Sequence, residues 1–315
     1  MITRHFKRSS MQTTSHILMI RPVNFNFNAE TAVNNAFQSA STAHPQVEAL
    51  REFDQFVAIL RDNGIDVTVI EDSPAPETPD SIFPNNWVSF HEDGTVCLYP
   101  MFAPNRRLER NPAVLQALGK RFRVSRTLDL SSYERQGLFL EGTGSMVFDR
   151  DNKIAYACLS PRTNKTVLLD FCALTGFTPE IFAAVDVNGQ PIYHTNVMMC
   201  VADRYVVACL DALPDPDERH HFIRTVGDSG KELIAISLAQ MNRFAGNMLQ
   251  LRNMDGEPLL VMSSQALDSL EPEQVEKLTS FNRILHTPLD AIETNGGGSA
   301  RCMLAEIHLQ PLEQR

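Results

Sequence analysis

The 315-residue sequence has no long apolar run, no excess of positive charge and no low-complexity segment. No apolar stretch approaches the roughly 20 residues that a membrane-spanning helix needs, so a membrane protein is not expected. Asp and Glu outnumber Lys and Arg by 38 to 28, and the net charge of −10 argues against nucleic acid or an anionic membrane as the main partner. Hydrophobic residues make up 43% of the chain, which is ordinary for a globular protein with a sizeable core.

The cysteine and glycine patterns exclude further classes of protein. The six cysteines include no Cys-x-x-Cys pair and the histidines show no metal-ligand spacing, so no metal site is expected. The glycines form neither a phosphate-binding P-loop nor a dinucleotide fingerprint, so no cofactor is expected. Five cysteines are interpreted as small buried side chains of a protein in the reducing cytoplasm: Cys97, Cys158, Cys172, Cys200 and Cys209. Cys302 differs from them because a glycine tract precedes it.

The two ends of the chain differ in character. Residues 1–10 are basic and lack the apolar core of a secretory signal, so we predict a disordered N-terminal tail. The proline-rich residues 73–79 are too few to separate independent domains. Residues 11–315 are therefore expected to form a single domain, and a homodimer is left open.

β-Hairpin signals recur along the chain. Apolar, β-rich runs flank short polar turns in residues 88–98, 146–159, 197–210 and 248–262. Successive turns lie roughly 50 to 60 residues apart, a spacing typical of radial or solenoid repeats. Helical patterns fall between them at residues 47–63, 108–118, 163–175, 215–226 and 272–281, and strands are expected at residues 16–21 and 302–308.

These elements predict an α/β fold. Four hairpin–helix units, with a fifth shared between the two ends of the chain, would close a ring and leave no open sheet edge. The strongest helical pattern has its apolar face at Val47, Leu50, Phe53, Val57 and Leu60. A two-layer α/β sandwich would fit the same elements, so the residues alone leave both architectures open.

The glycine tract at residues 296–298 is the most informative segment for chemistry. Glycines allow positive φ angles and close backbone approach, which suits a tight and accessible turn. Backbone N–H groups of this turn and the neighbouring Arg301 are expected to favour the thiolate of Cys302, which is the nucleophilic form. The alternative is a glycine-rich turn beside a cysteine without a catalytic role.

Two further residues could assist such a thiol. Glu141 lies between an apolar run and Gly142, and His194 lies in a polar segment that leads into apolar residues. A thiol nucleophile needs a base whose tautomer is fixed by a third group. Each residue alone could equally be a solvated carboxylate or a structural histidine, but with Cys302 they predict a nucleophile, an imidazole and its carboxylate partner.

The order Glu141, His194, Cys302 resembles that of the guanidino-group-modifying enzymes, which include arginine deiminases, dimethylarginine hydrolases and amidinotransferases. Four segments carry the resemblance: PDSIFPNN at residues 79–86, RRLE at 106–109, SPRTN at 160–164 and GGGSARC at 296–302. It covers residues 17–308 and is closest to the bacterial citrulline-utilisation hydrolase type. It implies a five-bladed pseudo-symmetric α/β propeller of ββαβ-like modules (the pentein fold), with residues 11–315 as one catalytic domain.

The resemblance also implies roles for the residues at matching positions. Cys302 would be the nucleophile, His194 the general acid and base, and Glu141 its partner. The substrate α-carboxylate would be bound by Arg162 together with Arg106 or Arg107, through forked charge-assisted hydrogen bonds. Asp80 would receive the α-ammonium group.

Asn86 and Asn196 depart from the family pattern, because deiminases have Asp where these residues stand. A guanidinium donates hydrogen bonds from every nitrogen, whereas a ureido group also has a carbonyl acceptor and so suits a carboxamide. We therefore expect a thiol-dependent hydrolase that cleaves the ureido C–N bond of citrulline. Arginine deimination or dimethylarginine-type hydrolysis is the main alternative, and amidino transfer is a weaker one. A non-catalytic binding protein on the same fold is the alternative from another class.

Overall fold

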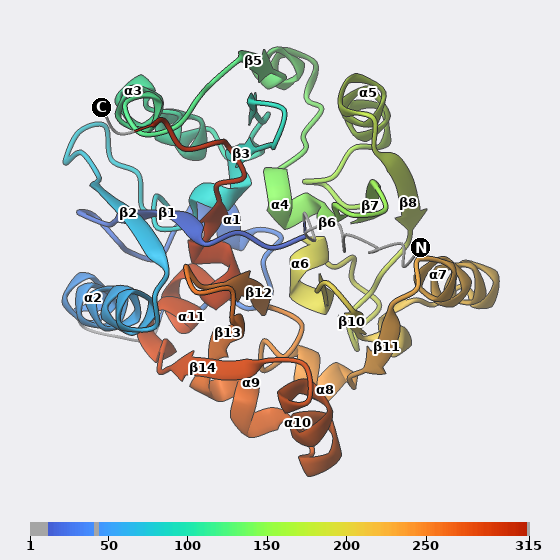
Figure 1. Cartoon of the computed structure of the whole chain (residues 1–315). Helices are drawn as coiled ribbons and strands as arrows, with labels where there is room; N and C mark the ends of the chain where they lie inside the picture. The colour runs from blue at the N-terminus through green and yellow to red at the C-terminus, as the bar shows by residue number, and fades with distance from the viewer. Residues whose placement is uncertain (1–11, 41–43, 314–315) are drawn as a thin grey trace, which may run out of the picture.

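The computed structural model describes residues 12–40 and 44–313, and its strands form five three-stranded sheets arranged around one axis (Figure 1). The sheets comprise β15 (Ala305–Glu306), β1 (His16–Arg21) and β2 (Asp66–Glu71); β3 (Val88–Phe90), β4 (Thr95–Leu98) and β5 (Arg126–Asp129); β6 (Val147–Asp149), β7 (Ile154–Cys158) and β8 (Thr178–Phe182); β9 (Met199–Val201), β10 (Tyr205–Ala208) and β11 (Glu232–Ala235); and β12 (Leu249–Arg252), β13 (Pro258–Ser263) and β14 (Arg283–Thr287). The predicted N-terminal tail, residues 1–10, lies outside the described residues.

Each sheet repeats one connection. Its first and second strands pair antiparallel, and the second strand is parallel to the third. A helical crossover joins the second strand to the third, formed in chain order by α2 (Pro45–Asp62), α3 (Pro112–Gly119), α5 (Lys165–Thr175), α7 (Pro216–Asp228), and α9 (Ser264–Ser269) with α10 (Pro272–Thr279). This is the expected ββαβ module in the expected ring of five.

The two ends of the chain close the ring. β1 pairs antiparallel with β15, with Ile17 opposite Glu306 and Leu18 opposite Ala305. The last strand is shorter than predicted, because residues 302–308 include only the two-residue β15, and Cys302 lies in a 3₁₀ turn ahead of it. The thiol is therefore fixed by a helical turn rather than by a strand.

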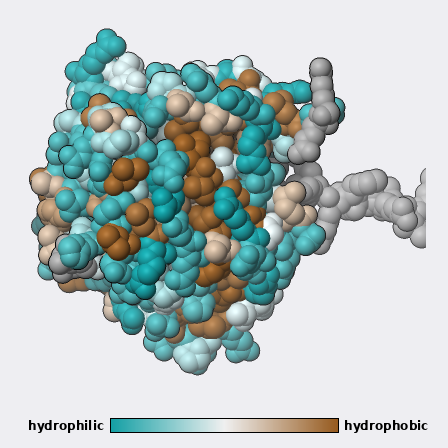
Figure 2. All heavy atoms as spheres, turned by 90° about the vertical axis from the view of Figure 1, so that its left-hand side faces the viewer, coloured by the Kyte–Doolittle hydropathy of each residue, from teal (hydrophilic) through white to brown (hydrophobic). Residues whose placement is uncertain are grey.

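The longest helix, α2, begins with a proline at its first turn and ends before Gly64, whose φ of +80° suits glycine. Phe53, Val57 and Leu60 of the predicted apolar face are buried. Val47 is 64% exposed instead, since the helix meets the sheets only from its second turn onward. Figure 2 shows the side of the molecule that carries α2, where a band of hydrophobic residues crosses a mainly hydrophilic surface.

A short helical turn leads into the first strand of four modules. These turns are η1 (Pro84–Asn86) before β3, α4 (Gly142–Ser145) before β6, α6 (Thr195–Met198) before β9, and η5 (Ala300–Met303) before β15. The first strands lie nearest the axis, where β15 contacts β3 and β9 contacts both β6 and β12 (Figure 1). The turns therefore converge at one mouth of the ring.

The remaining short helices connect the modules. They are α1 (Ala29–Ala32), α8 (Leu238–Met241), α11 (Asp290–Gly296), η2 (Asn105–Glu109), η3 (Ser131–Gln136) and η4 (Leu210–Ala212). Buried hydrophobic side chains fill the space between the sheets and the crossover helices; one cluster joins Phe53 and Phe56 of α2 to Leu249 and Leu259 of the neighbouring sheet. In the part of the chain that the structure describes, no helix has the length and apolar character needed to cross a membrane.

Candidate active site

Polar residues stand just ahead of the first strand in every module. Asn86 ends η1, Glu141 immediately precedes α4, and His194 immediately precedes α6. Asn247 lies two residues before β12, and Cys302 is part of η5. Because these five positions are related by the ring, residues that are far apart in sequence meet at one mouth of the axis.

The Cys302 thiol is buried, with only 4% of the residue exposed. Two carboxamides donate hydrogen bonds to its sulfur, from Asn196 Nδ2 at 3.5 Å and Asn247 Nδ2 at 3.3 Å. Burial raises the pKa of the thiol, although the Ser299 backbone contact, Asn247 and Arg301 act in the opposite direction. The turn and Arg301 favour the thiolate as expected, but the loss of water around the sulfur outweighs them, so the pKa of the thiol is raised overall.

His194 and Glu141 form a buried pair. His194 Nε2 lies 2.8 Å from Glu141 Oε2, and Arg162 Nη1 lies 3.5 Å from the same oxygen. Burial alone would raise the pKa of Glu141, but Arg162 and the hydrogen bond to His194 hold it well below its usual range. Burial lowers the pKa of His194 to about 4, even though Glu141 opposes this shift. The pair is thus an ionised carboxylate with a neutral imidazole.

This pairing fixes the tautomer of the imidazole. An ionised carboxylate can only accept a hydrogen bond, so Nε2 of His194 carries the proton and Nδ1 keeps a free lone pair. A Cβ atom added at Gly144 would lie 2.7 Å from His194 Nδ1 and 2.5 Å from Asn86 Nδ2. The absence of a side chain at Gly144 therefore allows both His194 Nδ1 and the Asn86 amide to lie close to this position.

Arg106 determines how the Asn86 carboxamide is oriented. Arg106 Nη1 donates to Asn86 Oδ1 at 2.7 Å, and its Nε and Nη2 form a two-point ion pair with Glu109 at 2.8 and 2.9 Å. A guanidinium can only donate, so the oxygen of Asn86 must face Arg106 and its NH₂ group must face away. The fork of Arg106, expected to bind a substrate carboxylate, is instead occupied by Glu109.

The other expected anchoring residues divide into two groups. Asp80 and Arg162 are both 2% exposed and line the cavity beside Cys302. Asp80 Oδ1 is buried and has no hydrogen-bond partner among the described residues, while Arg162 Nε donates to Asn34 Oδ1 at 2.8 Å. Arg107 points elsewhere: its guanidinium donates to the backbone carbonyls of Met101 and Phe102. Of the two adjacent arginines, only Arg106 lines the cavity.

The cavity itself is small, about 20 Å³, which is room for about one water molecule. Its lining consists of Thr31, Asn35, Asp80, Phe83, Asn86, Arg106, Arg162, Tyr193, His194, the three glycines 296–298 and Cys302. Of the three glycines, Gly297 has a positive φ, +63°, whereas Gly296 and Gly298 approach the Phe83 ring closely. An amino acid can bind here only if some of the lining side chains move apart.

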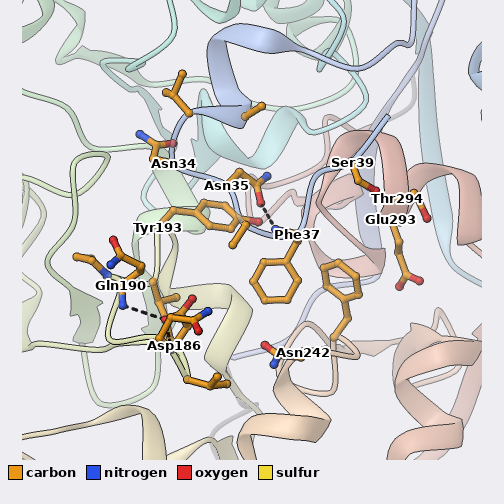
Figure 3. A pocket seen from close by; sticks show the side chains of 18 of the residues that line it. Asn34, Asn35, Phe37, Ser39, Asp186, Gln190, Tyr193, Asn242, Glu293 and Thr294 are labelled. Atoms are coloured by element: carbon orange, nitrogen blue, oxygen red, sulfur yellow. Dashed lines mark hydrogen bonds between the residues drawn. The ribbon is translucent and has the colours of Figure 1, made fainter. Parts of the chain in front are cut away.

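A larger pocket of about 670 Å³ adjoins this cavity (Figure 3). Asn35 and Tyr193 line both spaces. The Tyr193 hydroxyl donates to the carbonyl of Gly297 at 2.6 Å, and Asn35 Nδ2 donates to the same oxygen at 3.3 Å. Phe37 lies beside Tyr193 on the pocket side, with ring centroids 6.2 Å apart (Figure 3). These residues form the partition between the pocket and the cavity.

Asn247 is a site residue that the sequence did not reveal. Its Nδ2 also donates to the Asn196 carbonyl at 2.8 Å, and its Oδ1 accepts from the Arg301 N–H at 3.1 Å, so both ends of the carboxamide are fixed. The signal that could have found it is positional. Like Asn86 and Asn196, it stands two or three residues before a first strand.

Within residues 12–40 and 44–313, no group of three or more His, Cys, Asp or Glu side chains is arranged to hold a metal ion. A family model described as N,N dimethylarginine dimethylhydrolase, eukaryotic, matches residues 21–309, which is most of the chain. A comparison with curated protein sequences finds no match.

Solved structures share the fold at low sequence identity. Unliganded ArgZ, described as an arginine dihydrolase from the ornithine–ammonia cycle in cyanobacteria, aligns with a TM-score of 0.74 and 17% identity, covering 95% of this chain and 41% of that chain. Its N-terminal domain, as a cysteine-to-serine mutant bound to substrate, aligns with a TM-score of 0.73 and 18% identity over 93% of this chain and 97% of that one. DDAH from Pseudomonas aeruginosa, also a cysteine-to-serine mutant and in complex with citrulline, aligns with a TM-score of 0.64 and 14% identity, covering 94% of this chain and 100% of that chain. The chain thus spans less than half of the ArgZ chain in the first of these structures. The five sheets and the fold shared with these structures confirm the expected five-bladed propeller.

Proposed function

The chain belongs to the family described as N,N dimethylarginine dimethylhydrolase, eukaryotic, and is a hydrolase of carbon–nitrogen bonds other than peptide bonds; we propose that the bond it cleaves is the ureido bond of citrulline. The expected membership of the guanidino-group-modifying superfamily and the expected hydrolase class are confirmed by the family match. Citrulline as the substrate is our proposal. Its hydrolysis would yield ornithine, ammonia and carbon dioxide.

The observation that carries this proposal is the orientation of Asn86. Arg106 donates a hydrogen bond to Asn86 Oδ1 at 2.7 Å, and one N–H of Asn86 Nδ2 donates to Asn85 Oδ1 at 3.1 Å. What remains for a ligand is a single N–H donor. A ureido carbonyl accepts such a hydrogen bond, whereas a guanidinium has only donors and would oppose it.

Asn196 offers the complementary group. Its Nδ2 is directed to the Cys302 sulfur, and its Oδ1 is buried with no hydrogen-bond partner in the described ranges. A buried acceptor without a partner is costly, and an N–H of the ligand would satisfy it. Together the two carboxamides offer one donor and one acceptor, which matches a neutral ureido group.

The reaction starts from a neutral thiol and a neutral imidazole. As the Cys302 sulfur attacks the ureido carbon, its proton passes to His194 Nδ1, and Glu141 stabilises the imidazolium that forms. Asn86 donates to the oxygen on which negative charge develops. His194 then protonates the departing nitrogen. The C–N bond breaks, and a thiocarbamate remains on Cys302. Water activated by His194 hydrolyses this intermediate, and the resulting carbamate releases carbon dioxide.

Asp80 and Arg162 are proposed to hold the amino-acid end of the substrate. The free oxygen of Asp80 is suited to the α-ammonium group, and the guanidinium of Arg162, which lines the cavity, is suited to the α-carboxylate. Arg106 is committed to Glu109 and Asn86, so we assign it the role of orienting Asn86.

Substrate preference tests the proposal. We expect a higher kcat/KM for citrulline than for arginine or N,N-dimethylarginine, measured by ornithine and citrulline release. Asn86→Asp should shift the preference toward arginine by at least about tenfold, since a carboxylate accepts from both Arg106 and a guanidinium. Asn188→Asp makes the same change at an exposed position and should leave the preference unaltered. If arginine is the better substrate of the unmodified enzyme, the carboxamide argument is wrong.

The nucleophile is tested separately. Cys302→Ser should lower turnover by about a thousandfold or more, because a hydroxyl is a poor nucleophile near neutral pH. Cys172→Ser, at a buried cysteine of α5 remote from the cavity, should keep most of the activity. A Cys302→Ser enzyme with more than about 1% of the original rate would exclude covalent catalysis by this residue.

A further inference from the structure

A second polar pocket lies at the other mouth of the ring. The strands β3, β6 and β15 have the candidate active-site residues ahead of them, and His91, Arg150 and His308 follow the same three strands. These three side chains and Lys153 line a pocket of about 400 Å³. The three strands therefore separate this pocket from the catalytic cavity by their own length.

Arg150 is the unusual residue of this pocket. Only 5% of it is exposed, and its Nη2 is buried with no hydrogen-bond partner among the residues that the structure describes. The guanidinium carbon of Arg150 lies over the Phe148 ring, 5.2 Å from its centroid. A buried guanidinium with an unused donor lacks the compensation that buried charges normally have.

The neighbouring acid supplies only part of this compensation. Glu306 is bound to Arg301 Nη2 at 2.8 Å and lies 3.5 Å from His308 Nε2. Burial lowers the pKa of Arg150, and the charge of Arg301 lowers it further, while Glu306 acts in the opposite direction. Two arginines thus share one glutamate at this end of the axis.

The rest of the lining suits an anion. Lys153 adds a second cation, and the neutral imidazole of His91 can donate one N–H, whereas the N–H of the neutral His308 is directed to Glu306. Glu92 and Asp93 also line the pocket, but both are exposed at its rim, where water screens their charge. Asp93 is further engaged by Arg126 at 3.4 Å.

We propose that this pocket binds a phosphoryl-type oxyanion, with Arg150 as its central donor and Lys153 as a second contact. A guanidinium and an ammonium around one cavity are the groups that phosphate prefers. The oxyanion could be free phosphate or the phosphate group of a small ester. The site is independent of the proposed citrulline hydrolysis, because it lies at the opposite end of the strands.

Calorimetric titration of the full chain tests the proposal, with sodium phosphate and glycerol phosphate at constant ionic strength. We expect saturable one-to-one binding, and the ligand that binds more tightly identifies the source of the oxyanion. Arg150→Gln should weaken it by about tenfold or more, the loss expected for one charge-assisted hydrogen bond. Lys120→Gln removes the same charge from an exposed position and should leave the affinity unchanged.

Two further variants keep the test decisive. Lys153→Gln changes an exposed turn residue and should also weaken binding, so it serves if Arg150→Gln fails to fold. Arg162→Gln, in the catalytic cavity, should leave phosphate binding unchanged. The proposal is overturned if neither anion binds saturably, if Lys120→Gln weakens binding as much as the pocket variants, or if Arg162→Gln abolishes it.

Discussion

At the scale of single residues, the low pKa of His194 has consequences for activity. In the proposed mechanism the imidazole must be neutral to accept the thiol proton, and burial lowers its pKa from 6.5 to about 4. We therefore expect kcat/KM to stay level between pH 6.5 and pH 5 and to fall as the pH drops through about 4. A pH–rate profile of kcat/KM checks this. An acid limb centred at the ordinary histidine value would contradict the burial of a neutral imidazole.

Stability must be followed in the same experiment. His194 and His308 both have pKa values lowered to about 4, so the unfolded chain takes up protons between pH 6.5 and pH 4 that the folded chain does not. The contribution of these histidines to stability is therefore present above pH 6.5 and is lost as the pH falls toward 4. Circular dichroism at each pH separates loss of fold from protonation of the base.

Gly144 offers a second test at this scale. In Gly144→Ala the new Cβ would lie 2.7 Å from His194 Nδ1 and 2.5 Å from Asn86 Nδ2, so at least one of them must move. Because misplacement by about 1 Å can cost a hundredfold, we expect kcat to fall on that order while the fold is retained. Gly227→Ala is the control, since its Cβ meets no atom within 4 Å. Unchanged kcat in Gly144→Ala would show that the close approach of these two groups to Gly144 is not needed.

Residue type and residue orientation differ in how far the sequence predicts them. Cys302, His194, Glu141, Asp80 and Asn86 were recognisable as site candidates, because their neighbours in sequence have a characteristic pattern. The direction in which Asn86 points was not, since it depends on Arg106, 20 residues further along. Arg106 and Arg107 are adjacent in the sequence, yet Arg106 lines the cavity and Arg107 donates to backbone carbonyls. The backbone course of η2 determines this difference, and the sequence alone does not reveal it.

At the scale of elements, helix α11 depends on a carboxylate from elsewhere in the chain. Its N-cap residue, Leu289, makes no side-chain cap, and Glu52 of α2 instead accepts the N–H groups of Ala291 and Ile292, each at 3.0 Å. Glu52 is 4% exposed, so its loss would leave two buried donors without partners. α11 ends in the glycine tract before Cys302. Glu52 thus links the longest helix to the segment that carries the thiol.

We expect Glu52→Ala to lower the free energy of unfolding by about 1–3 kcal/mol, the cost of a buried polar group without its partner. Urea denaturation provides the measurement. Glu48→Ala on the same helix removes an exposed carboxylate that pairs with Arg51, and should change stability by less than about 0.5 kcal/mol. Equal effects of the two substitutions would mean that the contact with α11 contributes nothing.

The elements themselves were predicted unevenly. The four hairpins were found because polar turns interrupt apolar runs, and all four are present at the expected places. The third strand of each module was missed. β5, with the sequence Arg-Thr-Leu-Asp, is largely exposed and lacks the alternation that marks a half-buried strand, so its conformation depends on the parallel neighbour β4.

At the scale of the whole molecule, the two ends of the chain lie in one sheet. The Ile307 N–H donates to the His16 carbonyl at 2.9 Å, but a linker that joins residues 313 and 12 must reach from Leu312, which binds Arg121, to Gln12, which binds Phe148 and Val201. A circular permutant with new ends between Asp255 and Gly256, in an exposed turn, is expected to fold and to keep its activity. Thermal melting and kcat/KM measure both. A permutant opened between the buried Asn86 and Trp87 should fail, and its survival would contradict the importance of the turn η1.

The pairing of β1 with β15 also has a consequence in time. During synthesis β1 emerges well before β15, so one edge of the first sheet stays open for tens of seconds at roughly 5–20 residues per second. The thiol emerges in that same final segment, three residues before β15. A nascent chain can therefore assemble the other four modules before β15 emerges, but it can complete the cavity only afterwards. The Cys302 sulfur therefore reaches the His194 imidazole only when β15 pairs with β1.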